Sequence, residues 1–286
     1  MLSFLRHTPR FFFFFLALLS ASHGAFAETV RITGSTTVNP VVADAAEQLR
    51  DTSGLRIRID TAGGSSGGIN ALGDGRAEIA MSSRQLNASD QRKFPDVDFH
   101  AVRIGEDAIS IVVSRDVWES GVRSITPAQM RGIYEGTHTN WKQLGGEDRR
   151  IVFFNKEPGR GTWEVFVKWL YGDKAKAPRV SHPEVGANAE VRSKVGRTRG
   201  ALSFVSTPWV DDTSLFALSI QEGDELIAPT PSAIASHRYP LSRPLFLITA
   251  GTPRGDAKAV IDYLLSDQGQ AIVARHGYLK LDQLRE

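Results

Sequence analysis

Three short segments of the chain combine glycine with hydroxyl side chains in a pattern that suits a multiply charged oxyanion. They are GSTT at residues 34–37, GGSSGG at residues 63–68 and GRGT at residues 159–162. Glycine lets backbone N–H groups approach a ligand closely, and Ser and Thr add neutral hydroxyl donors. A helix that begins directly after each segment would add unpaired N–H groups and the positive end of its dipole. Three such helix N-termini that meet at one point would form a cage for an anion.

Each of these segments lies between an expected strand and an expected helix. Residues 29–33 alternate as a strand before the first segment, and residues 55–60 do so before the second. Residues 150–155 form an apolar strand before the third segment, and residues 163–170 after it carry an apolar face at helical spacing. The sequence therefore predicts the unit strand, loop, helix three times.

The rest of the chain continues the alternation of strands and helices. Further strands are expected at residues 78–83, 107–114, 201–205 and 243–250, and further helices at residues 126–134, 255–265 and 267–276. Thr126 with Pro127 and Gln129 is typical of a helix start, because it places a hydroxyl at the cap, Pro at the first turn and Gln at N3. Alternating strands and helices predict an α/β fold with mainly parallel sheets and helices on both faces.

The N-terminal residues have the pattern of an export signal. Arg6 and Arg10 precede the apolar run 11–19, and Ala25-Phe26-Ala27 is a small-residue cleavage site. The apolar run is about half as long as a membrane-spanning helix, which makes an anchor the weaker interpretation. We therefore expect residues 1–27 to be a signal peptide, cleaved after Ala27, and the mature protein to lie in the periplasm.

Charge and composition argue against several classes of protein. Removal of residues 1–27 takes away two of the 34 basic residues and leaves 32 basic and 32 acidic ones, so the mature chain is neutral. A neutral chain without a run of Lys or Arg gives no sign of nucleic-acid binding. The chain has no Cys, which excludes disulfides and thiolate metal sites. Its histidines do not have the spacing of a metal-binding pair, and we expect neither a metal nor a cofactor.

A serine hydrolase is the alternative from another class of protein. Residues 63–67 satisfy G-x-S-x-G between an expected strand and an expected helix, which would make Ser65 the nucleophile and His276 a possible base. No oxyanion-hole motif precedes Ser65, and His276 stands beside Gly277 at the end of a helix, as an ordinary C-terminal cation does. The glycine-rich segment is therefore interpreted as a binding loop, and we expect no enzymatic activity.

Seven ordered blocks of the sequence carry a family resemblance. They are ITGSTTVNPVV, TAGGSSGGINALGDGRAEIAMSSRQL, MRGIYEGTHTNWKQLGG, KEPGRGTWEVF, GALSFVS, YPLSRPLFLI and LLSDQGQAIVARHGYLKL. Over residues 29–281 the chain resembles the phosphate-binding proteins of ABC phosphate importers. The resemblance implies a two-lobed periplasmic-binding-protein fold with two crossing hinge strands, at residues 107–114 and 243–250. It also implies a monomer that holds inorganic phosphate between its lobes and delivers it to an ABC permease in the inner membrane.

The resemblance also divides the mature chain into lobes. Residues 28–110 would form the first part of lobe 1, and residues 111–242 would form lobe 2. Residues 243–286 would return to lobe 1. Binding of phosphate would then close the two lobes around the crossing strands.

The first set of ligand contacts that the resemblance implies lies in the N-terminal half of the chain. Thr36 and Thr37 match the family's first contact, and Ser65 matches the Ser of the second loop. Ser83 and Arg84 belong to the matching SSR segment. Longer members of the family have an Asp at the position of Ser83, and an ionised carboxylate there would reject fully ionised sulfate. Sulfate and arsenate therefore stay open as alternative ligands.

The second set of implied contacts surrounds the third loop. The family has a basic residue followed by GSGT, and these positions fall on Lys156 and on Gly159, Arg160, Gly161 and Thr162. Lys156 stands where Arg is usual, and an ammonium group cannot grip two oxygens as a guanidinium does. Arg160 replaces the middle Ser and could restore a guanidinium. Which of Arg84, Lys156 and Arg160 contacts the ligand stays open.

Overall fold

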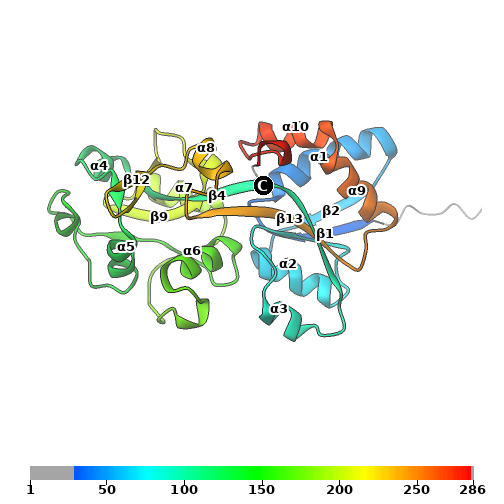
Figure 1. The fold of residues 1–286 in the computed structure, drawn as a ribbon, viewed down its shortest axis with the longest axis horizontal. Helices are drawn as coiled ribbons and strands as arrows, with labels where there is room; N and C mark the ends of the chain where they lie inside the picture. The colour runs from blue at the N-terminus through cyan, green and yellow to red at the C-terminus, as the bar shows by residue number, and fades with distance from the viewer. Residues whose placement is uncertain (1–28, 285–286) are drawn as a thin grey trace, which may run out of the picture.

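Two lobes lie side by side and are joined by two long strands (Figure 1). The computed structural model describes residues 29–284. The predicted signal peptide, residues 1–27, and its cleavage after Ala27 lie outside the described residues.

The first lobe contains the beginning and the end of the described chain. Its elements are β1 (Val30–Gly34), α1 (Asn39–Ser53), β2 (Ile57–Asp60), α2 (Gly64–Gly73), β3 (Ile79–Ser82), α3 (Ala88–Lys93), α9 (Gly255–Leu265) and α10 (Asp267–Arg275). Strands β1, β2 and β3 pair in parallel. Helices α1, α9 and α10 pack together on one face of these strands, and α2 and α3 lie on the other (Figure 1).

The second lobe contains the middle of the chain. Its elements are α4 (Arg115–Glu119), β5 (Ser124–Ile125), α5 (Pro127–Tyr134), β6 (Val152–Phe153), β7 (Asn155–Lys156), α6 (Gly161–Tyr171), β8 (Glu184–Val185), α7 (Asn188–Arg197), β9 (Ala201–Ser206), β10 (Phe216–Ala217), β11 (Ser219–Glu222), β12 (Glu225–Ile227) and α8 (Pro231–Ala235). Short 3-10 helices at Trp141–Leu144, Lys174–Lys176 and Thr207–Trp209 belong to the same lobe, and one at Leu281–Gln283 follows α10. The capping box predicted at the start of α5 is confirmed, because Thr126 and Gln129 bond each other's backbone N–H groups.

Two crossing strands make the sheets of the two lobes continuous. They are β4 (Phe99–Val113) and β13 (Ser242–Ala250), and the strand order is β2-β1-β3-β13-β4-β9-β6. Both were predicted, although β4 begins eight residues earlier than residue 107. The sheet is more mixed than predicted, because β13 runs antiparallel to both β3 and β4, and β4 runs antiparallel to β9. Parallel pairing remains on either side of these strands, between β1 and its neighbours and between β6 and β9.

Each lobe has its own hydrophobic core. One core gathers Val30, Ile32 and Ile79 from the first strands with Leu264 from α9. The other gathers aromatic side chains of the second lobe, including Phe166, which stacks on Phe204 at a ring distance of 3.9 Å. Strand β4 contributes Ile104 to the first core and the apolar side chains among residues 108–113 to cores of the second lobe. The polar groups described below therefore lie between two separately packed bodies.

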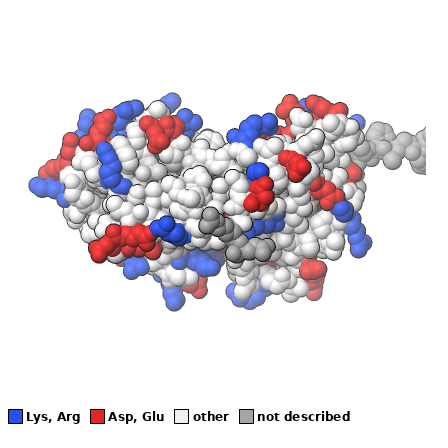
Figure 2. Space-filling view, turned by 45° about the horizontal axis from the view of Figure 1, so that its top comes forward, with Lys and Arg blue, Asp and Glu red and all other residues white. Residues whose placement is uncertain are grey.

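Two wider properties of the described residues bear on partners. Within residues 29–284, helices fall short of the length and apolar character needed to cross a membrane. The same range contains no group of His, Asp and Glu side chains placed to hold a metal ion. On the face that Figure 2 shows, basic and acidic side chains are interspersed over both lobes, and neither sign covers the surface.

Candidate anion-binding site

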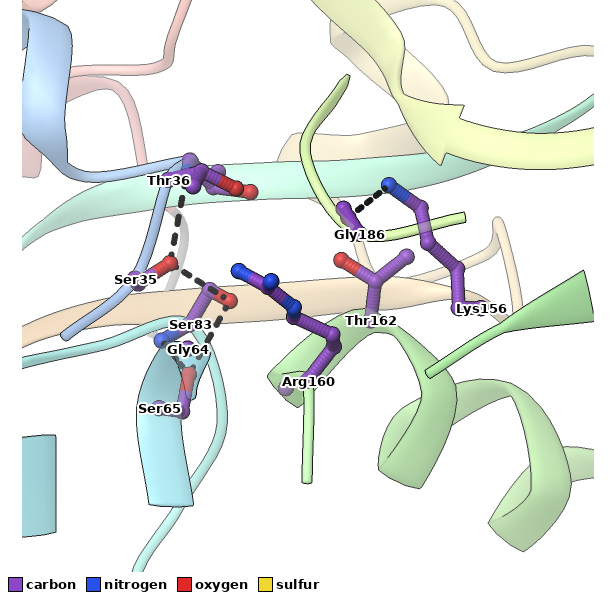
Figure 3. Close-up of a pocket in the computed structure, with 11 residues that line it drawn as sticks. Ser35, Thr36, Gly64, Ser65, Ser83, Lys156, Arg160, Thr162 and Gly186 are labelled. Atoms are coloured by element: carbon purple, nitrogen blue, oxygen red, sulfur yellow. Dashed lines mark hydrogen bonds between the residues drawn. The ribbon is translucent and has the colours of Figure 1, made fainter. Parts of the chain in front are cut away.

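A small polar cavity lies where the three glycine-containing segments meet (Figure 3). The space open to a water-sized group is about 10 Å³, far less than the roughly 300 Å³ of pockets for drug-sized ligands. Its lining residues come from both lobes and are Ser35, Thr36, Thr37, Gly64, Ser65, Ser83, Lys156, Arg160, Gly161, Thr162 and Gly186. Eight of the ten residues predicted from the sequence are among them. The size and lining suit a small polar ion.

Helix N-termini supply part of this lining, as the loop sequences predicted. Helix α2 begins at Gly64 and helix α6 at Gly161, and residues 35–37 lead into α1. The first turn of each helix has N–H groups without a helical acceptor. A Cβ atom on Gly161 would lie 2.4 Å from the Ser65 hydroxyl oxygen. Glycine is required there because helix α6 of one lobe approaches helix α2 of the other so closely.

Arg243 organises the hydroxyl groups of the cavity, and the sequence analysis missed it. Its guanidinium is 1% exposed and donates to the hydroxyl oxygens of Thr162 at 2.9 Å, Thr37 at 3.2 Å and Ser83 at 3.3 Å. It also donates to Asp107 at 2.7 Å. Because these three hydroxyl oxygens accept hydrogen bonds from Arg243, their own hydrogens are available to donate toward a ligand.

The serines of the cavity form a second small network. The Ser35 hydroxyl donates to the Ser83 oxygen at 3.0 Å, and the Ser83 backbone N–H donates to the Ser65 oxygen at 3.1 Å. The dashed lines in Figure 3 follow these contacts from the end of β1 to the start of α2. They fix the side chains from the first lobe that line the cavity, which reduces the reorganisation needed when a ligand binds.

Lys156 lies at the second-lobe side of the cavity and is 1% exposed. Its Nζ donates to the Gly186 carbonyl at 2.9 Å and to the Asn188 side-chain oxygen at 3.1 Å. Burial lowers the pKa of Lys156 to about 7, and the nearby positive charges of Arg243 and Arg160 act in the same direction. A buried amine whose described hydrogen-bond partners are neutral is therefore poised between its two protonation states near neutral pH.

Arg160 lines the cavity as predicted but already has partners in the protein. Its guanidinium donates to Glu157 at 2.6 and 2.9 Å and to the Thr61 carbonyl of the first lobe at 3.3 Å. The side chain is 15% exposed. Arg160 therefore bridges the lobes and brings positive charge to the cavity, but Glu157 compensates part of that charge.

Arg84, one of the three basic residues left open as ligand contacts, lies outside the lining of the cavity. Arg84 is buried but is not among the lining residues, and its guanidinium pairs with Asp90 at 2.7 Å and with Glu164 at 3.0 Å. Gly159 is also outside the lining, and its carbonyl accepts the Ser66 N–H at 3.1 Å from the opposite lobe. Both residues connect the lobes beside the cavity, which explains why they share the sequence segments of the true lining residues.

Signals for three of the unpredicted residues were present in the sequence. Ser35 and Gly64 lie inside segments that were recognised as loops, and only their inward position was missed. Arg243 stands at the start of a predicted strand, and a charged residue in a buried strand indicates a special role. Gly186 had no such signal, because it reaches the cavity through the pairing of β8 with β7.

The structure separates the two residues that the hydrolase alternative requires. The described hydrogen bonds of the Ser65 hydroxyl are with Ser83, and His276 contacts Asp44 at 2.9 Å at the end of α10. A nucleophilic serine needs a base within hydrogen-bond reach. The G-x-S-x-G match is therefore part of a binding loop.

Comparisons with known proteins extend over almost the whole chain. Residues 20–268 match the family model described as a PBP superfamily domain. A putative phosphate ABC transporter substrate-binding protein with bound phosphate from Clostridium perfringens is 30% identical, with a TM-score of 0.78 over 89% of this chain and 100% of that one. An ABC-type phosphate transport receptor from Vibrio cholerae is 29% identical, with a TM-score of 0.71 over 87% of this chain and 99% of that one. The phosphate-binding protein PstS of Bacillus subtilis is 28% identical over 90% of this chain and 82% of its own length. These findings confirm the predicted two-lobed fold and the family resemblance, and the chain belongs to the PBP superfamily of binding proteins.

Proposed function

We propose that this protein is a periplasmic phosphate-binding protein, which holds inorganic phosphate between its two lobes and delivers it to an ABC permease. The observation that carries the proposal is the cavity in which three glycine-containing loops, helix N-termini and the hydroxyls bonded to Arg243 point donors at one small space. Backbone N–H groups and hydroxyls at helix N-termini are well suited to tetrahedral oxyanions. Its family and its phosphate-binding relatives support a carrier and not an enzyme.

Charge in and around the cavity supports an anion as the ligand. Lys156 and Arg160 line it, and Arg243 lies directly behind the hydroxyls. Asp107 is the carboxylate that pairs with Arg243, and Glu157 pairs with Arg160. A dianion would therefore enter a site whose two arginines are each paired with one carboxylate, and whose N–H and hydroxyl donors act in a low dielectric, where their interactions with the ion are stronger than in water.

Relatives with phosphate in their names support phosphate over other tetrahedral anions. The Clostridium perfringens structure has bound phosphate, and the Vibrio cholerae relative is named as a phosphate transport receptor. Delivery to a permease of the inner membrane, export with cleavage after Ala27, and a monomeric state belong to the same proposal. So does the division into lobe 1 (residues 28–110 and 243–286) and lobe 2 (residues 111–242), with phosphate contacts from the eight predicted residues that line the cavity.

Titration calorimetry of the mature protein with phosphate tests the function, and a Thr162→Val variant tests the site. Val keeps the shape of Thr162 but removes the hydroxyl that accepts from Arg243 and faces the cavity. Loss of a hydrogen bond to a charged ligand should weaken phosphate binding by about 1.5–3 kcal/mol. Thr52→Val, at an exposed position near the end of α1, is the matched control and should leave the affinity unchanged. Unchanged affinity of Thr162→Val would remove this cavity as the binding site, and an absence of phosphate binding by the unmodified protein would overturn the function.

A further inference from the structure

The cavity offers hydrogen-bond donors almost everywhere around a ligand. The hydroxyls of Thr37, Ser83 and Thr162 have their oxygens occupied by Arg243, and the helix N-termini present N–H groups. In the described chain, none of the eleven lining residues carries a carboxylate. Monohydrogen phosphate, however, has one P–OH group that must donate to an acceptor when the ion is buried. Apart from hydroxyl oxygens such as that of Thr36, the side chains of the loops supply no acceptor, and a stronger acceptor would hold the P–OH group better.

Lys156 is placed to supply it. Its Nζ donates two hydrogen bonds, to the Gly186 carbonyl and to the Asn188 side-chain oxygen. A neutral amine has two N–H groups, and both are then used, so the tetrahedral position left over holds the nitrogen lone pair. An ammonium group would hold its third N–H at that position. Lys156 lines the cavity, so a lone pair at this remaining position would be an acceptor within the lining.

The surroundings of Lys156 favour the neutral amine. Arg243 of β13 and Arg160 at the start of α6 act on it with positive charge, and Glu190 of α7 and Glu157 after β7 act with negative charge. Both carboxylates already have partners, because Glu157 pairs with Arg160 and Glu190 accepts the Gly186 N–H at 2.8 Å. Burial and the two arginines bring the pKa of Lys156 down to about 7, so the amine is mostly neutral above that pH.

We propose that the neutral Lys156 amine accepts a hydrogen bond from the P–OH group of bound phosphate, and that this contact makes the site select tetrahedral oxyanions that carry a proton. This proposal rests on the proposed function and explains the ligand selectivity of the same site. Phosphate and arsenate bring their own proton to Lys156. Sulfate has none at neutral pH, so it can bind only when Lys156 takes up a proton from solvent and presents an N–H instead of a lone pair.

The proposal predicts different pH dependences for the two anions. Binding of sulfate takes up one proton above the pKa of Lys156, and its affinity should therefore fall about tenfold for each pH unit between about pH 7.5 and pH 9.5. Binding of monohydrogen phosphate exchanges no proton in this range, and its affinity should stay constant. The ratio of phosphate to sulfate affinity should then rise about tenfold for each pH unit.

Titration calorimetry of the mature protein with sodium phosphate and sodium sulfate measures both affinities, and repetition in buffers of different ionisation enthalpy gives the number of protons taken up. We expect about one proton for sulfate and none for phosphate at about pH 8.5. Lys156→Arg, which stays charged, should bind sulfate with an affinity that no longer depends on pH. Lys168→Arg, on an exposed position of α6, is the matched control and should keep the dependence of the unmodified protein.

The possible outcomes separate this proposal from the function on which it rests. Phosphate binding with a phosphate-to-sulfate ratio that is constant with pH overturns the role of Lys156 and leaves the function intact. Sulfate that fails to bind even at about pH 6 also overturns that role, because a charged Lys156 should accept it. Failure of phosphate itself to bind overturns the function and the proposal together. Should Lys156→Arg not fold, the proton count of the unmodified protein decides alone.

Discussion

Beside the cavity lies a second set of polar side chains, and the two differ in how their charges are paired. We call this second set the Glu164 cluster, and it consists of Ser66, Arg84, Asn87, Asp90, Glu164 and Lys174. Both contain buried arginines, and both connect the two lobes. In the Glu164 cluster, Arg84 has two carboxylate partners, and Glu164 also accepts from Ser66 at 2.7 Å and from Lys174 at 2.8 Å. In the cavity, Arg243 has one carboxylate partner and otherwise donates to hydroxyls. Arg160 pairs with one carboxylate, and Lys156 donates to two neutral oxygens.

This difference separates a structural contact from a binding site. Opposite charges compensate each other in the Glu164 cluster, because Arg84 and Lys174 each contact a carboxylate. The cavity keeps an excess of hydrogen-bond donors, which an anion would satisfy. A buried charged residue is therefore informative about function only when its partners are known, because burial alone describes Arg84 and Arg243 equally well.

Replacement of Arg243 by Met should have the largest effect on the stability of the protein. It leaves Asp107 buried without its cation, and breaking one side of a buried ion pair lowers the free energy of unfolding by about 3–5 kcal/mol. Urea denaturation measures this loss. Burial already raises the pKa of Asp107, and Arg243 opposes that rise. Without Arg243, the pKa of Asp107 in the folded state rises further above its value in the unfolded state. The destabilisation should therefore be large at neutral pH and shrink as the pH falls far enough to protonate Asp107.

The double variant Arg243→Met with Asp107→Leu is the control for this prediction. Removal of both charges should restore part of the lost stability and abolish its pH dependence, because no unpaired carboxylate remains. Phosphate binding should stay weak in both variants, since the hydroxyls of Thr37, Ser83 and Thr162 lose the donor that orients them. Normal affinity in the single variant would show that Arg243 does not orient the donors of the cavity.

Replacement of Glu164 by Gln tests whether the Glu164 cluster is a structural contact and not part of the binding site. Gln keeps the size of Glu164 but removes the charge that Arg84 and Lys174 contact, so the free energy of unfolding should fall by about 1.5–3 kcal/mol. Because Glu164 does not line the cavity, phosphate affinity should change less than it does in Thr162→Val. Glu119→Gln, at an exposed surface ion pair, should change neither quantity. A larger loss of affinity than of stability would place the Glu164 cluster in the binding site.

The parts of the molecule that depend on local sequence were predictable. A helix N-terminus at each of the three segments and the capping box of α5 follow from glycine placement, apolar periodicity and cap residues, and the structure has them. The predicted loops were too long, because α2 begins at Gly64 and α6 at Gly161, inside their segments. The convergence of Ser65, Gly161 and Thr162 on one space also followed, since each of them stands at the start of a helix that follows a strand.

The parts that depend on distant pairing were not predictable. The antiparallel course of β13 between β3 and β4 brings Arg243 to Thr37, 206 residues away in the sequence, and no local pattern records that register. Arg84 pairs with Glu164, which lies in helix α6 of the opposite lobe, and does not line the cavity. Sequence patterns place charged residues near a site, but the tertiary structure decides which of them a carboxylate neutralises.

Arg160 shares one feature with each of the two regions, and its replacement should have the smallest effect on phosphate affinity. It lines the cavity, yet Glu157, which is 45% exposed, pairs with its guanidinium. A partly exposed and partly compensated charge contributes little, so Arg160→Ser should weaken phosphate binding by less than about 1 kcal/mol. Calorimetry at low and high salt checks this, because the difference between the variant and the unmodified protein should shrink as salt screens the charge. If Arg160→Ser binds equally well or more tightly at low salt, Arg160 belongs with the saturated contacts of the Glu164 cluster, and the charge that the anion meets comes from Arg243 behind the hydroxyls.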